Sequence, residues 1–388
     1  MTASVTHVVH GVAGYGLPGH SPALPDAVLG HETWEAVLAE VVNHRLTGHL
    51  LGALDDGAFT AQDDQHAAAV DAHERALAVD LMLERLLLAT VAQLDAADIT
   101  PRVLRGSAVA HSVYPEPGLR SFADVDLLVP QHDYDTAVAL LCAHGARRRY
   151  QEPRKGFDRR FGKGACLEIP SCLGLEIDLH RTLVAGPFGL AVDTDALFEG
   201  STRFLLGEQE LHGLDPEDRF LDACFHAALG NKQPYLVPLR DVAQMILCSP
   251  LDVAQVRERC RAWRCGIVVQ RAIGLAWEAF ALDATPEVVR WARHHDCSVF
   301  EQRALHSYVR SDRSYARQAV AGLNALRRVG DKARYASALL LPNRTYVRTR
   351  EGSYRRRARR ALRLLLDENS GRRRQASSDS SHVRSALP

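Results

Sequence analysis

Two aspartates, Asp124 and Asp126, stand two positions apart in a short apolar run, a spacing that suits metal-dependent chemistry. In a β-strand, side chains two positions apart point to the same face, so both carboxylates would share one side of a sheet. A third carboxylate, Asp178, alternates with apolar residues in a later run of period two. If the two predicted strands pair, the three carboxylates meet and could hold two divalent cations about 4 Å apart.

The alternative for the Asp124–Asp126 pair is a solvated strand face. Two observations favour the metal site. Aspartate is a poor strand residue, and adjacent like charges are unfavourable without a cation. Upstream, Gly106 and Ser107 fall between a predicted strand and a helix start. Backbone N–H groups at such a turn can bind phosphate, although an ordinary helix N-cap is the simpler interpretation of this dipeptide taken alone.

Three further residues have both a functional and a structural interpretation. Arg120 either clamps a triphosphate or neutralises a structural carboxylate. His180 lies two positions after Asp178 and so shares its face, where it would support the metal site or contact an acceptor, or simply end the strand. Lys232 either reaches a phosphate or is a solvated loop residue. His226, on an apolar helix, is interpreted as a core histidine.

The surrounding pattern predicts a mixed α/β core between two helical regions. The period of the apolar residues changes from helical to strand-like at Thr100-Pro101. It becomes helical again at Asp215-Pro216, where Asp215 is placed to cap the N-terminus of a helix that begins with Pro216. The basic segment 147–164 is expected to form a hairpin that either lines the site or is solvated. We expect these regions: a disordered N-terminus (1–25), an N-terminal helical region (26–99), the core (100–212), a C-terminal helical region (213–366) and a disordered basic tail (367–388).

Charge and cysteine usage narrow the class of protein. The chain has 388 residues with 47 basic and 47 acidic side chains. From Asn343 onward, 13 Arg oppose four acidic residues, so this end carries about +9 and could bind an acidic partner. The remainder is acidic, which argues against nucleic acid. Eight Cys without CxxC spacing, no secretory signal and no apolar run of about 20 residues predict a cytoplasmic protein that does not span a membrane.

Taken in order, these motifs resemble the uncharacterised bacterial nucleotidyltransferase family of the polymerase-β-like superfamily. The resemblance rests on the runs Val103 to Ala110, Tyr114-Pro115, Arg120, Asp124 to Val129 and Glu176 to His180. It extends to the flanks, at the Trp34 helix, the Asp215 to His226 helix, Leu239 to Val242 and the stretch after Leu341.

The resemblance implies an α+β fold, with a small mixed sheet and helices on one face, that acts on a nucleoside triphosphate. It implies that Asp124 and Asp126 hold two Mg²⁺ or Mn²⁺ ions. Asp178 would hold one of these ions and help the acceptor hydroxyl lose its proton. Gly106 and Ser107 would cradle the β- and γ-phosphates. Arg105 would bind the nucleotide phosphates beside this turn, but it is a departure, because the family often has Lys there and a guanidinium is a fork rather than a point charge.

We therefore expect a metal-dependent nucleotidyltransferase that moves an NMP group from an NTP to an unknown acceptor and releases pyrophosphate. The alternative is a catalytically silent protein that uses the same pocket to bind a nucleotide or to scaffold a biosynthetic pathway. For the enzyme, Asp126→Asn should abolish turnover. Because like charges repel, the same substitution is expected to leave stability unchanged or higher.

Overall fold

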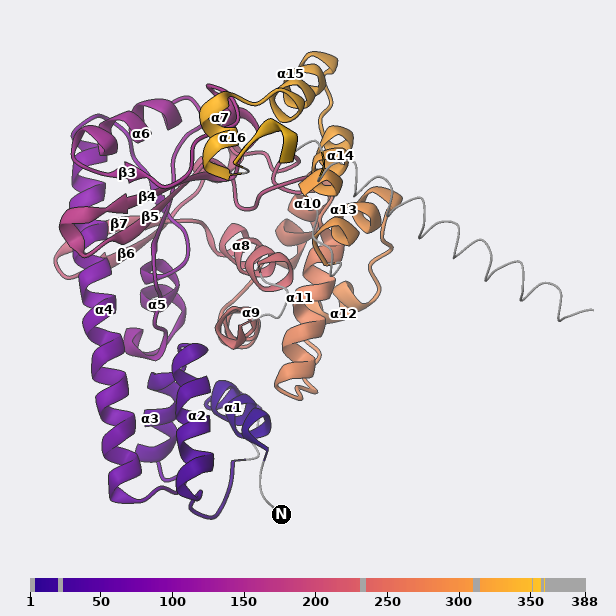
Figure 1. Ribbon diagram of the computed structural model, residues 1–388. Helices are drawn as coiled ribbons and strands as arrows, with labels where there is room; N and C mark the ends of the chain where they lie inside the picture. Colours follow the sequence, from indigo (N-terminus) through magenta and orange to yellow (C-terminus); the bar gives the residue numbers. More distant parts are fainter. Residues whose placement is uncertain are drawn as a thin grey trace, which may run out of the picture.

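The computed structural model describes residues 4–19, 24–230, 235–309, 315–350, 352–356 and 359. Its first part is helical (Figure 1). The helices are α1 (Val5–Gly14), α2 (His31–Asn43), α3 (Thr47–Asp55) and α4 (Asp63–Asp95). The long α4 runs along one side of the molecule, from α2 and α3 to the sheet, and so joins the N-terminal helices to the central core.

The prediction that residues 1–25 are disordered is wrong for α1. Val8, Val9 and Val12 are buried, because they recur at helical spacing and cover one face of this helix. The Arg240 guanidinium donates to the carbonyls of Ala13 and Tyr15 at 2.8 and 2.6 Å, which fixes the end of the helix. The glycine, histidine and proline content of the segment obscured this apolar stripe in the sequence.

The centre of the molecule is one mixed sheet of seven strands, in the order β3-β4-β5-β2-β1-β7-β6. The strands are β1 (Arg102–Val103), β2 (Val125–Leu128), β3 (Arg147–Arg148), β4 (Gly164–Ile169), β5 (Leu175–His180), β6 (Thr202–Leu206) and β7 (Gln209–Gly213), and the helices between them are α5 (Ser107–Val113), α6 (Tyr134–Ala143) and α7 (Phe157–Phe161). On one face, apolar side chains of β2 and β5 pack with those of α4 and α6 in a single core. The predicted α+β class is confirmed.

The basic segment 147–164 is more than the predicted hairpin. β3 does pair with β4 in antiparallel fashion, but α7 lies in the connection between them. The Phe157 ring stacks on Tyr335 and the Arg154 side chain donates to the Leu341 carbonyl, so C-terminal helices pack against this edge of the sheet. Several of its cations are used in ion pairs, such as Arg148 with Asp158.

The described residues from Pro216 onward form helices joined by short connections. The helices are α8 (Pro216–Leu229), α9 (Leu236–Cys248), α10 (Val253–Trp263), α11 (Gly266–Ala279), α12 (Glu287–Arg293), α13 (Val299–Val309), α14 (Tyr315–Ala325), α15 (Val329–Leu340) and α16 (Arg344–Arg350). The Asp215 side chain caps α8 by accepting from the backbone N–H of Asp218 at 2.8 Å. The predicted helix 355–366 lies mostly, and the tail 367–388 entirely, outside the described residues.

Within the part of the chain that the structure describes, no helix is both long and apolar enough to cross a membrane.

Candidate active site

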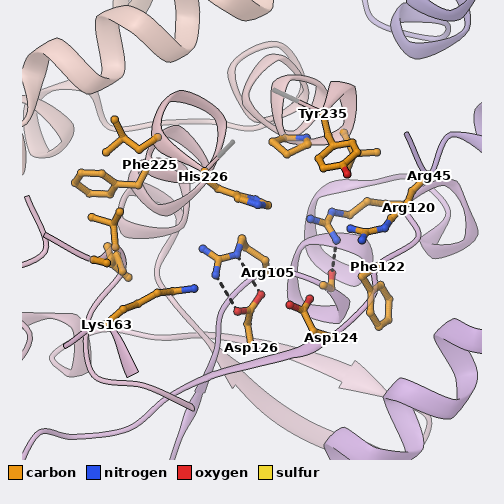
Figure 2. Close-up of a pocket in the computed structure, with 18 of the residues that line it drawn as sticks. Arg45, Arg105, Arg120, Phe122, Asp124, Asp126, Lys163, Phe225, His226 and Tyr235 are labelled. Atoms are coloured by element: carbon orange, nitrogen blue, oxygen red, sulfur yellow. Dashed lines mark hydrogen bonds and ion pairs between the residues drawn. The ribbon is translucent and has the colours of Figure 1, made fainter. Parts of the chain in front are cut away.

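The pairing of β2 with β5 brings two of the predicted carboxylates side by side. The strands are parallel, with Asp126 opposite Asp178 in register. Both side chains leave the face of the sheet that is opposite the α4 and α6 core, because strand side chains alternate. Asp126, Asp178 and His180 each offer a ligand atom, and these atoms lie within 4.8 Å of one another. Asp124, just before β2, lines the same cavity as Asp126 (Figure 2).

The two aspartates of the pair differ in their electrostatics. Burial, and then the charge of Asp126, raise the pKa of Asp124 to about 6. Burial also opposes the charged form of Asp126, but Arg105 and His180 outweigh it and hold the pKa of Asp126 well below its ordinary value. At neutral pH, Asp126 is therefore a fixed anion, whereas Asp124 is an anion that lacks a full countercharge and attracts a cation.

Arg105 provides the countercharge of Asp126. Its Nε and one terminal nitrogen donate to the two carboxylate oxygens at 3.2 and 2.9 Å, and its other terminal nitrogen donates to Asp222 on α8 at 2.8 Å. All three side chains are buried. Burial raises the pKa of Asp222 to about 6 despite the contact with Arg105. The sequence assigned Arg105 to phosphate binding and gave no indication of this double ion pair.

His180 also contacts Asp126. Its Nε2 lies 2.6 Å from Asp126 Oδ1, and its ring is 1% exposed. Burial, followed by the charge of Lys163, lowers the pKa of His180, which favours a neutral ring whose Nε2–H donates to the carboxylate. His180 thus orients Asp126. The other residue predicted in a supporting role, Lys232, lies outside the described residues.

The glycine–serine turn lies at the end of β1, next to β2. Gly106 has φ of +49°, a value that side chains disfavour, and it lines the cavity. Ser107 begins α5 and is buried. Arg120 holds this turn, because it donates to the Gly106 carbonyl at 3.5 Å and to both oxygens of Asp241 on α9, the shortest at 2.8 Å. These contacts give Arg120 a structural role, and its side chain also lines the cavity.

A cavity of about 490 Å³ lies over these groups, a volume typical of small-molecule sites. Figure 2 shows Lys163 and Phe225 at one end and Arg45, Phe122 and Tyr235 at the other, with the aspartates between them. The sheet order explains this arrangement, since Lys163 precedes β4 while the glycine–serine turn follows β1. The cavity thus has two ends that flank the carboxylates.

The structure adds one contributor from a segment whose role the sequence left open and two that were misread or missed. Lys163 Nζ lies 3.5 Å from Asp178 Oδ2, so one cation of the basic segment does reach the site. His226 lines the cavity rather than the core, and burial followed by the charge of Arg105 lowers its pKa. Asp222 was not singled out. The available signal was its position as an aspartate in the mostly apolar stretch Phe220 to Leu229 of α8.

These features define a class of protein. A mixed sheet presents adjacent carboxylates from parallel strands, beside a glycine turn and cations in a cavity of small-molecule size, and this is the arrangement expected of a nucleotidyltransferase core. The model of the family described as "Uncharacterised nucleotidyltransferase" matches residues 30–281, which is more than half of the chain. The chain belongs to this family, and the resemblance noted in the sequence is confirmed.

Among solved structures, the chain is similar to an antigenic nucleotidyltransferase-like protein from Paracoccidioides brasiliensis. The two are 16% identical, and the match covers 53% of this chain and 95% of that one with a TM-score of 0.31. No protein with a curated function matches the chain.

Proposed function

We propose that this protein transfers an NMP group from a nucleoside triphosphate to a hydroxyl or similar acceptor on a small molecule, peptide or protein. The acceptor oxygen forms a bond to the α-phosphorus, the bond from that phosphorus to the bridging oxygen of the β-phosphate breaks, and pyrophosphate leaves. The observation that carries the proposal is the register of Asp126 with Asp178 on parallel strands, next to a cavity that Asp124, Asp126 and several cations line.

The donor set fits divalent cations. In the part of the chain that the structure describes, four carboxylates in or beside the cavity (Asp124, Asp126, Asp178 and Asp222) outnumber three cations (Arg45, Arg105 and Lys163), since Arg120 is paired with Asp241. This excess of negative charge and the grouping of carboxylate oxygens suit Mg²⁺ or Mn²⁺. Asp124 and Asp126 would hold two ions and Asp178 would share one. When bound, the ions supply charge stabilisation for the phosphoryl oxygens.

The remaining roles belong to the chain itself. Asp178 would accept the proton of the acceptor hydroxyl, and Lys163 would hold that carboxylate in place. The Gly106–Ser107 turn would bind the β- and γ-phosphates, with Arg105 and Arg120 adding positive charge at this end. Because the turn and Lys163 lie on opposite sides of the aspartates in the sheet order, the triphosphate and the acceptor would enter from opposite ends.

The decisive experiment incubates the protein with each α-labelled NTP, Mg²⁺ and a panel of acceptors, and identifies products by mass spectrometry. We expect Asp126→Asn to lower turnover by at least about a thousandfold, because it removes a charge from the metal site. Asp135→Asn, which changes an exposed aspartate on α6, is the matched control and should keep full activity. Near-normal transfer by Asp126→Asn would overturn the proposal.

A silent nucleotide-binding or scaffolding protein is the second candidate. The observation that favours it is the Arg105 contact with both oxygens of Asp126, which already balances that carboxylate without a metal. This candidate predicts that NTP binds, as measured by calorimetry, while no acceptor in the panel is modified.

A further inference from the structure

The contacts of Asp126 leave little room for a metal ion. A carboxylate has about four lone-pair positions for hydrogen bonds or metals. Oδ1 of Asp126 accepts from His180 and from Arg105, and Oδ2 accepts from Arg105 Nε. Three of the four positions are thus taken by the chain itself. A cation on the fourth would lie next to a guanidinium that remains positively charged, so the two would repel each other.

Arg105 also contacts a second carboxylate, which is not a proposed metal ligand. Its remaining terminal nitrogen donates to Asp222 on α8 at 2.8 Å, and both side chains are almost fully buried. If Arg105 released Asp126, the contact with Asp222 would still balance the guanidinium inside the protein. Leaving a buried charge without a partner costs several kcal/mol. Because Asp222 keeps Arg105 paired, replacement of Arg105 by a metal ion at Asp126 costs less free energy.

We propose that Arg105 and a divalent cation compete for Asp126, so that Arg105 acts as an internal cation that sets the metal affinity of the site. In the metal-free protein, the guanidinium holds Asp126 and Asp222 together. When the metal takes Asp126, Arg105 stays on Asp222 and turns its free donors toward the cavity that it lines. The inference rests on the proposed function, because it takes Asp126 as a metal ligand, and it makes Arg105 a positioning residue rather than only a phosphate contact.

The test measures Mn²⁺ binding to the full chain, without nucleotide, by calorimetry or by the electron paramagnetic resonance of free Mn²⁺. Arg105→Lys is the critical variant. Lysine keeps the positive charge, so if Arg105 affected Mn²⁺ binding only through its charge, the affinity would not change. A single ammonium, however, cannot make the two-point contact with Asp126 and also keep the contact with Asp222. We expect its Mn²⁺ affinity to rise roughly tenfold, the scale of one charge-assisted hydrogen bond. Arg105→Gln should raise it further if that variant folds.

Arg240→Lys is the matched control. It removes a buried arginine fork from the carbonyls of Ala13 and Tyr15, away from the residues that line the cavity, so it should reduce stability but leave the Mn²⁺ affinity unchanged. If the native chain binds Mn²⁺ and Arg105→Lys binds equally or more weakly, the competition is overturned and the proposed function stands. If neither protein binds Mn²⁺, both the metal site and the inference fail. Binding by Arg105→Lys alone would support the competition strongly.

Discussion

Asp124 and Asp126 are two residues apart, yet their surroundings move their pKa values in opposite directions. Burial dominates at Asp124 and raises its pKa from 3.8 to about 6. At Asp126, burial acts in the same direction, but Arg105 outweighs it and the pKa falls well below the ordinary value. A shift of one unit corresponds to about 1.4 kcal/mol of difference between the two protonation states. The two residues should therefore affect stability with opposite signs.

We predict that Asp124→Asn stabilises the metal-free protein at pH 7.5, whereas Asp126→Asn destabilises it. The folded form of Asp124 binds its proton more tightly than the unfolded chain does, so this residue costs stability as the pH rises from about 4 through 6. Asn avoids that cost, with a gain on the order of 2 kcal/mol at pH 7.5 that shrinks toward pH 4.

Asp126→Asn instead removes the charged partner of buried Arg105 and should lower the free energy of unfolding by about 3 kcal/mol. Urea denaturation in EDTA at pH 5 and pH 7.5 measures both variants. A less stable Asp124→Asn at pH 7.5 would contradict the assignment of the unbalanced charge to Asp124.

This prediction for Asp126 reverses the expectation from the sequence, and the reason limits what sequence can reveal. The alternation of polar and apolar residues was enough to place Asp124, Asp126 and Asp178 on polar strand faces. It could not reveal that Arg105, 21 residues upstream, would pair with Asp126. Still less could it identify Asp222, which is 117 residues from Arg105 and reaches it only through the packing of α8 against the core.

At the scale of elements, local periodicity and capping gave the type of most elements but few of their partners. The strand around Asp178 was predicted from its period of two, and the Asp215-Pro216 start of α8 from its capping pattern. The sequence did not predict that β2 and β5 pair in parallel; we expected the carboxylates to meet only if the two strands pair. The register of two strands depends on the connection between them, which local patterns do not describe. The basic segment misled the prediction because its cations disguise a turn of helix, α7.

One contact between elements should control the site from outside it. Asp80 on α4 is buried, and its carboxylate accepts from the backbone N–H of Phe122 at 3.0 Å. Phe122 lies two residues before Asp124, so α4 fixes the segment that enters β2. Burial raises the pKa of Asp80 to about 6, while this hydrogen bond acts in the opposite direction.

We predict that Asp80→Ala slows turnover by roughly tenfold to a hundredfold, because displacement of a positioned group by about 1 Å has effects of that size. Amide hydrogen exchange over residues 120–124 should become faster in this variant. Asp80→Asn keeps an oxygen acceptor for the Phe122 N–H and serves as the matched control, with both measurements close to those of the native chain. Equal exchange rates in the two variants would show that this hydrogen bond does not order the segment.

At the scale of the whole molecule, the two ends of the chain differ in how they relate to the core. α1 packs with the C-terminal helices through its buried valines, and His10 Nδ1 lies 2.9 Å from the Ala279 carbonyl at the end of α11. Arg240 on α9 holds the carbonyls of Ala13 and Tyr15. The first helix is therefore part of the same core that supports α8 and α9, which carry Asp222 and Asp241.

The far end of the chain, from Gly371, has an arginine- and serine-rich sequence with too few apolar residues to bury a core of its own. We predict opposite results from two truncations of similar length. Removal of residues 1–16 should lower the thermal midpoint and abolish turnover, because it uncovers the apolar face of α9 and leaves one terminal nitrogen of the buried Arg240 without its acceptors. Removal of residues 371–388 should leave both the midpoint and the turnover number with a small acceptor unchanged.

The tail truncation has a second expected result. If the arginine-rich end binds an acidic partner, removal of residues 371–388 should weaken that complex, and the loss should be smaller in high salt, where exposed charges are screened. Binding to an acidic peptide at 50 mM and 500 mM NaCl, compared between the full chain and the truncated one, measures this effect. Loss of turnover toward every acceptor in the truncated protein would instead assign the tail to the active site, and the separation of a catalytic core from a basic tail would be wrong.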